Sequence, residues 1–170
     1  DHNVTFHPLH PEIAATIAAA LDELIATRRR EGEKLAEMIR GRIARMRELV
    51  ATVQPRVPAL VAEYQEKLAT RLRDAAATLD DDRIRLEVGL FAQRVDVAEE
   101  LSRLSTHLDE VERILKVGGA SGKRLDFLMQ ELNREANTLG SKAMAADMTA
   151  IAVELKLAIE QMREQVQNIE

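Results

Sequence analysis

Residues 122–142 read GKRLDFLMQELNREANTLGSK, and two periodic patterns run through this stretch. Apolar residues recur every three or four positions, at Leu125, Leu128, Leu132, Ala136 and Leu139. This spacing predicts an amphipathic helix with one buried face. A polar set keeps the same spacing beside it and is named the amide seam: Asp126, Gln130, Asn133 and Asn137. Amides hydrogen-bond without bringing charge into a partly buried place, so we expect this seam to face another helix, a neighbouring subunit or RNA.

The composition of the rest of the chain agrees with a helical fold. Of the 170 residues, 46% are hydrophobic, 31% are charged and only 2% are aromatic, which favours helices over a sandwich or barrel. We therefore predict an all-α fold, an elongated bundle of about five helices with long, coiled-coil-like packing in a single helical region. The expected helices cover about 11–53, 58–79, 83–116, 122–140 and 145–168, with a Gly-rich linker at 118–122.

Several classes of protein are excluded or disfavoured by what the sequence lacks. The chain has no cysteine, which excludes disulfides, thiolate metal ligands and a Cys nucleophile. No apolar run approaches the roughly 20 residues of a membrane span, so we expect a cytoplasmic protein with no membrane partner. The chain opens on Asp1, and we expect it to be a fragment that lacks an upstream domain.

The predicted third helix repeats the double pattern of residues 122–142. Its apolar positions are Val97, Leu101, Leu104, Leu108 and Val111. Beside them lies a set named the charged seam: Asp96, Glu100, Arg103, His107 and Glu110. If the two seams face one another, their acids could hold Mg²⁺ or Mn²⁺ against a phosphodiester. The alternative is a solvated face with i,i+4 ion pairs, each worth about 0.2–0.5 kcal/mol.

Positive charge collects near the start of the chain, although the net charge is −5. Between residues 24 and 50 there are eight basic and four acidic side chains. Such a local surplus on an acidic protein favours contact with phosphate at one place.

Four segments resemble the YicC-like (YicC/YloC) endoribonuclease family. They are residues 122–142, VELKLAIEQMREQVQNIE at 153–170, RVDVAEELSRLSTHLDEV at 94–111 and RRREGEKLAEMI at 28–39. The resemblance spans about residues 20–170, whereas family members carry a further β-containing N-terminal domain. It implies a bacterial, metal-dependent endoribonuclease that cleaves single-stranded RNA and acts in small-RNA turnover. It also implies a homo-oligomer, expected to be a hexamer, a divalent cofactor such as Mg or Mn, and an exoribonuclease as a candidate partner.

The resemblance also implies site residues, which we place on this sequence one by one. The catalytic candidates are Glu100, His107, Glu131 and Arg134. The metal candidates are Asp96, Glu99, Glu100, His107, Asp126 and Glu135. The RNA-binding candidates are Arg28, Arg29, Arg30, Arg40, Arg42, Arg103, Asn133, Asn137 and Lys142, with Arg45 and Arg47 as further phosphate contacts. The alternative function is a non-catalytic helical module that oligomerises or serves as an adaptor in RNA degradation, its polar seams giving pairing specificity.

Overall fold

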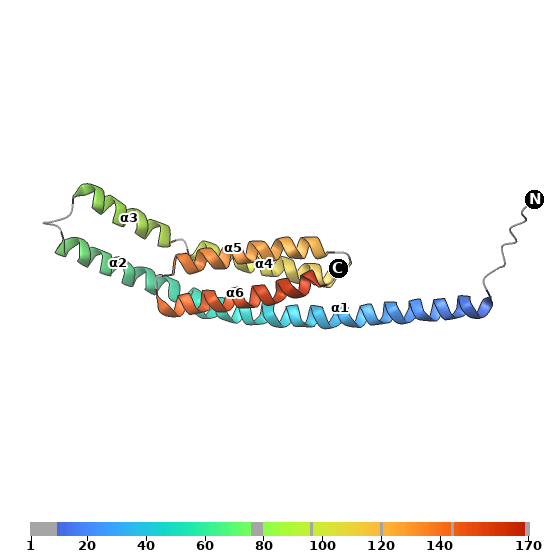
Figure 1. The fold of residues 1–170 in the computed structure, drawn as a ribbon. Coiled ribbons are helices and arrows are strands. Elements are labelled where there is room, and N and C mark those ends of the chain that lie inside the picture. Colours follow the sequence, from blue (N-terminus) through green and yellow to red (C-terminus); the bar gives the residue numbers. More distant parts are fainter. Residues whose placement is uncertain (1–9, 76–79, 96, 120, 144, 169–170) are drawn as a thin grey trace, which may run out of the picture. The chain divides into compact units, whose positions relative to one another are not determined.

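The computed structural model describes residues 10–75, 80–95, 97–119, 121–143 and 145–168. The elements in chain order are α1 Pro11–Val53, the 3₁₀ turn η1 Gln54–Arg56, α2 Val57–Asp74, α3 Asp81–Val95, α4 Val97–Val117, α5 Gly122–Ser141 and α6 Ala146–Gln167 (Figure 1). No strand occurs in these ranges, and the predicted all-α class is confirmed. None of the described helices combines the length and apolarity that crossing a membrane would require.

The chain forms two units, residues 1–37 and residues 38–170. The described part of the first unit is the N-terminal portion of α1. Five of its large apolar side chains are each about half exposed: Ile13, Ile17, Leu21, Leu24 and Ile25. These residues keep the three-and-four spacing of a buried helix face, yet nothing within this unit covers them.

The second unit is a bundle built on the apolar stripes of its helices. Both stripes predicted from spacing are confirmed, because all ten residues, Val97 to Val111 on α4 and Leu125 to Leu139 on α5, are at most 5% exposed. On α6 the buried stripe includes Met148, Leu155, Ile159 and Met162, and the part of α1 in this unit buries Ile39, Ile43 and Met46. Figure 1 shows α4, α5 and α6 running side by side with this part of α1.

Ion pairs between exposed or partly buried side chains mark which helices are neighbours in the bundle. Arg47 of α1 contacts Asp109 of α4 at 2.6 Å and Glu112 at 3.1 Å. On the other flank of α1, Arg45 contacts Glu154 of α6 at 2.9 Å. The helix α1 is therefore joined to both α4 and α6, and these contacts complete a four-helix arrangement with α5.

Two glycines end α4 and begin the connection to α5. Gly118 and Gly119 have φ angles of 71° and 89°, in the left-handed region that glycine adopts without strain. The Gly118 N–H donates to the carbonyl oxygen of Ile114 at 3.0 Å, which closes the last turn of α4. The helices α2 and α3 pack against each other, with the rings of Tyr64 and Phe91 stacked at 5.6 Å.

Candidate functional site

The helices α4 and α5 run antiparallel, and polar side chains bridge them at two levels. Arg103 of α4 contacts Glu135 of α5, and Glu110 contacts Arg124. At about 100° per residue, Arg124 and Glu135 lie on one flank of the buried stripe of α5 and the amide seam lies on the other. The charged seam therefore meets the flank opposite the amide seam. Gln130 is exposed and donates to Asp126 of its own helix at 3.1 Å.

The first polar group is named the buried cluster and consists of Glu99, Glu100, Arg103, Glu135 and Lys142. The Arg103 guanidinium donates from Nε to Glu135 at 2.9 Å and from a terminal nitrogen to Glu100 at 3.2 Å. Its other terminal nitrogen donates to Glu99. Lys142, at the C-terminal cap of α5, donates from Nζ to the same Glu100 oxygen at 2.8 Å. One arginine thus engages three carboxylates drawn from two helices.

Two of these carboxylates are deeply buried. Glu100 and Glu135 are 3% and 5% exposed and are the buried charged residues of the described chain. Glu100 follows Val97 by three positions and precedes Leu104 by four, so it lies at the edge of the apolar stripe. Burying a carboxylate costs free energy unless the carboxylate is paired with a cation. Arg103 and Lys142 are the cations that pair with these two carboxylates. The hydrogen bond to Glu135 is the main reason that the pKa of Arg103 is raised.

One oxygen of the buried cluster has no partner. Glu100 accepts both hydrogen bonds on Oε1, whereas its Oε2 is buried and accepts none from the described residues. Such an atom loses its hydration without compensation, which costs about 1–3 kcal/mol. The two buried carboxylates of the cluster face two cations, Arg103 and Lys142, and the third carboxylate, that of Glu99, is 64% exposed. Hydrogen bonding, and not charge, therefore leaves the cluster incomplete.

The candidate metal ligands do not form a metal-binding group in this arrangement. No three His, Cys, Asp or Glu side chains in the described ranges are placed to hold a cation together. The carboxylates of Glu100 and Glu135 are turned toward Arg103 and Lys142. Asp126 lies on the other flank of α5, and Asp96 lies outside the described residues. The carboxylates of Glu99, Glu100 and Glu135 are thus paired with cations of the chain.

The structure places the remaining candidates as follows. On α4, His107 is partly buried one turn beyond Arg103. On α5, Glu131 is partly buried one turn before Glu135, Asn133 is partly buried, and Arg134 and Asn137 are exposed. On α1, the exposed candidates are Arg28, Arg29, Arg30, Arg40 and Arg42. The charges of Arg45 and Arg47 are taken up by acids of the chain, so neither presents an unpaired charge to phosphate.

A second group on the α4–α5 interface is named the exposed cluster: Glu110, Arg113 and Arg124. Arg113 donates to both oxygens of Glu110, at 2.9 and 2.7 Å, and Arg124 donates to one of them at 2.8 Å. These hydrogen bonds, first that of Arg113 and then that of Arg124, lower the pKa of Glu110 from 4.5 to about 2. Glu110 is therefore a fully satisfied anion and is unsuited to accept a proton near neutral pH.

Sequence reasoning missed Arg124 and Arg163. Arg124 joins α5 to α4 through Glu110, and the Nε of Arg163 on α6 is buried without a partner in the described chain. Both side chains look like ordinary charges on a solvated helix flank. The way in which neighbouring helices are rotated against each other distinguishes these two arginines from solvated ones. The periodicity of the sequence gives no information about that rotation.

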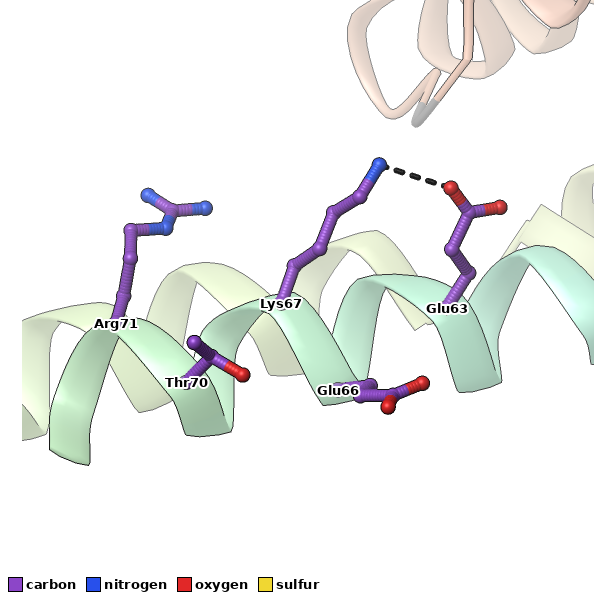
Figure 2. Close-up of a pocket in the computed structure, with 5 residues that line it drawn as sticks. All are labelled: Glu63, Glu66, Lys67, Thr70 and Arg71. Carbon is purple, nitrogen blue, oxygen red and sulfur yellow. Dashed lines mark hydrogen bonds and ion pairs between the residues drawn. The ribbon is translucent and has the colours of Figure 1, made fainter. Parts of the chain in front are cut away.

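A shallow pocket beside α2 is a second place where polar side chains gather. Glu63, Glu66, Lys67, Thr70 and Arg71 line it, all from one helix and all exposed (Figure 2). Lys67 donates to Glu63 at 2.8 Å within it. None of the candidate site residues lines this pocket, and none of its polar groups is buried. The buried cluster is therefore the stronger site.

Comparison with known proteins identifies the family. Two relatives bear the name probable endoribonuclease YicC. The protein from Haemophilus influenzae is 51% identical over 162 residues, which cover 93% of this chain and 56% of the relative. The protein from Clostridioides difficile is 36% identical over 154 residues, which cover 89% of this chain and 53% of the relative. The chain thus spans about half the length of these curated relatives. The family model described as endoribonuclease YicC-like, C-terminal, matches residues 53–170, and the chain belongs to this family.

Proposed function

We propose that this chain carries the cleavage centre of an endoribonuclease that acts on single-stranded RNA, and that the buried cluster is this centre. One observation carries the proposal: Glu100 and Glu135, from two helices, are buried and bridged by one arginine. The names of the relatives support ribonuclease activity at the level of the family. Action in bacterial small-RNA turnover, as a homo-oligomer and alongside an exoribonuclease, belongs to the same proposal.

The chemistry of the cluster suits phosphodiester cleavage. Cleavage needs a base to take a proton from the attacking hydroxyl, an acid to protonate the leaving oxygen and positive charge beside the phosphate. Glu100 has an oxygen without a hydrogen-bond partner, and carboxylates are common bases. His107, four residues after Arg103, is the neighbouring group that can donate a proton. Lys142 supplies the positive charge.

A divalent cation, Mg or Mn, remains part of the proposal as the cofactor. When bound, it would supply Lewis-acid stabilisation of the phosphate. The described acids could hold it only where Arg103 or Lys142 releases them, because their carboxylates are otherwise occupied.

RNA would approach through the exposed arginines. Arg40 and Arg42 of the second unit are exposed, and so are Arg28, Arg29 and Arg30 of the first. Contacts of this kind reach phosphates, which carry no base identity. Three Phe and one Tyr leave few rings for base stacking, so we expect weak sequence preference.

The second candidate function is a non-catalytic helical module that assembles with other chains. Two observations favour it. Arg103 uses all three of its donor nitrogens on acids of the chain, as a purely structural ion pair would. The apolar stripe of the first unit is exposed, as a surface for another helix would be.

A cleavage assay separates the two functions. The chain and its Glu135→Gln variant would be incubated with 5′-labelled single-stranded RNA and Mn²⁺, with and without a chelator. A matched control is Glu160→Gln, which changes an exposed acid of α6. We expect Glu135→Gln to slow cleavage by about 100-fold at unchanged helicity, because it removes a charge that holds Arg103. Equal rates for all three proteins, or no cleavage by any, would favour the helical module.

A further inference from the structure

The solvent-facing side of α5 carries a row of exposed residues that contains no acid. This row is named the outer stripe: Lys123, Phe127, Gln130, Arg134, Asn137 and Ser141. The spacing of three and four positions keeps its members on one side of the helix. Asp126 and Glu131 lie to either side of the stripe, and each is partly buried. On a chain with a net charge of −5, an acid-free row with two cations is a place where an anion can bind.

Phe127 is the residue of the outer stripe that packing does not explain. It is 58% exposed, whereas Tyr64 and Phe91, the other aromatic residues that the structure describes, are partly buried and stack on each other. Its neighbours in the stripe, Lys123 and Gln130, are polar and exposed, so no apolar surface continues along the stripe. A single ring among polar side chains suits a flat ligand with polar edges better than the apolar face of another helix.

Two cations of the outer stripe are available to phosphates. Neither the Lys123 ammonium nor the Arg134 guanidinium forms an ion pair or a hydrogen bond with the described residues. In contrast, Arg103 and Arg124 at the α4–α5 interface are bound to acids. At 1.5 Å per residue, Lys123 lies about 6 Å before Phe127 along the helix axis, and Arg134 lies about 10 Å beyond it. A base stacked on the ring would therefore have a cation on each side for its flanking phosphates.

We infer that the outer stripe binds single-stranded RNA, with one base stacked on Phe127 and the phosphates on either side held by Lys123 and Arg134. Every base has a π-face, so such stacking tolerates many sequences. Paired bases are stacked on one another and leave no face for the ring, so the stripe selects unpaired RNA. Glu135 and Lys142 of the buried cluster lie on the next face of the same helix, and a strand on the stripe runs beside them. The choice of RNA as the ligand rests on the proposed function, while its binding is tested without cleavage.

Stacking is tested by fluorescence anisotropy with a labelled 2′-O-methyl RNA of about 12 nucleotides, within the range of single-strand sites, in the presence of a chelator. We expect Phe127→Ala to weaken binding by about tenfold, because the stacked base loses its platform. Phe127→Tyr should retain wild-type affinity, whereas Phe127→Leu, which is apolar but has no ring, should lose as much as the alanine variant. The matched control is Leu157→Ala, which removes a 60% exposed side chain of α6 and should bind like wild type. Circular dichroism verifies that each variant is folded.

An abasic oligonucleotide of the same length separates stacking from charge. It keeps the phosphates and lacks the bases, so wild type and Phe127→Ala should bind it equally weakly. Arg134→Gln should weaken the binding of both oligonucleotides and lower the slope of log affinity against log salt by about 0.7. Lys156→Gln, which removes an exposed lysine of α6, should leave that slope unchanged.

Wild-type RNA affinity of Phe127→Ala, or an equal loss on the abasic strand, would overturn the inference. Failure of the wild-type chain to bind the RNA would overturn it as well. A change in sedimentation mass of Phe127→Ala at unchanged RNA affinity would also overturn it, and would assign the ring to contact between copies of the chain. Binding that depends on Phe127 in a chain that does not cleave RNA would retain the inference and reject the proposed function.

Discussion

The buried and exposed clusters lie on the same pair of helices and use the same chemistry, yet they are built in opposite ways. The exposed cluster sets one acid, Glu110, between two arginines that satisfy both of its oxygens. The buried cluster sets three acids around two cations and leaves Oε2 of Glu100 without a partner. Glu110 is 26% exposed and Glu100 only 3%. The exposed cluster is thus complete where hydration is still available, and the buried one is incomplete where it is not. On this difference we base the proposal that the exposed cluster is structural and the buried cluster is functional.

The largest effect is expected from a change that breaks both clusters together. Leu108 of α4 is 0% exposed and lies in the stripe on which both clusters depend. Leu108→Ala should lower the free energy of unfolding by about 2–5 kcal/mol, because it removes buried methyl groups and leaves a cavity. Urea unfolding followed by circular dichroism measures this. Leu157→Ala on α6, where the side chain is 60% exposed, is the control and should change stability by less than about 0.5 kcal/mol.

The next effect separates the clusters by activity. Glu100→Gln should slow RNA cleavage by about 100-fold, because the amide can neither act as a base nor hold Lys142 as an ion pair. Glu110→Gln, the same chemical change in the exposed cluster, should leave the cleavage rate as it is. Single-turnover cleavage of labelled RNA measures both. A similar loss in the two variants would show that the assigned difference between the clusters is wrong.

A smaller effect compares an exposed arginine with a paired one. Arg42 is exposed on α1, whereas Arg45 contacts both Glu48 and Glu154. Arg42→Ala should weaken RNA binding and lower the slope of log affinity against log salt by about 0.7, the value for one phosphate contact on a single strand. Arg45→Ala should leave the slope unchanged, because acids of the chain already neutralise Arg45. Fluorescence anisotropy at several salt concentrations gives the slopes, and equal slopes for the two variants would contradict this interpretation.

The smallest effect concerns pH and belongs to the exposed cluster alone. The folded-state pKa of Glu110 is about 2, below its ordinary value of 4.5. Ionised Glu110 therefore stabilises the fold above pH 4.5, and this contribution is lost as the pH falls from 4.5 toward 2. Glu110→Gln should accordingly be less stable than wild type at pH 6, and the difference should shrink at pH 3. Urea midpoints of the two proteins at both pH values test this, and a constant difference would rule it out.

Much of the fold could be predicted because apolar spacing specifies helix faces directly. Leu101, Leu104 and Leu108 on α4, and Leu125, Leu128 and Leu132 on α5, are all buried as their spacing predicts. Which flanks of α4 and α5 contact each other could not be predicted from the sequence. Spacing shows which residues share a face, but it does not show how one helix is rotated against its neighbour. The charged seam therefore meets Arg124, Glu135 and Lys142, and the amide seam lies on the other flank of α5.

The residues of the buried cluster are among the predicted site candidates, but their contacts with one another could not be predicted. The resemblance to the family pointed to all five residues of the buried cluster, but it assigned Arg103 and Lys142 to RNA and Glu100 and Glu135 to catalysis or metal. In the structure these four side chains bind one another. Residue type and spacing carry no information about burial at the edge of a stripe, and burial is what makes Glu100 and Glu135 different from the many exposed acids of the chain.

Gly140 lies where α5 packs against α6, so the size of the residue at position 140 limits how closely these two helices approach. A Cβ atom at this position would lie 3.5 Å from the Cβ of Ala152, an ordinary contact distance, so alanine fits there. A larger side chain would push α5 away from α6 at a point two residues before Lys142. Tolerance at position 140 should therefore stop at alanine, and a branched residue there should disturb the reach of Lys142 toward Glu100 without touching either of them.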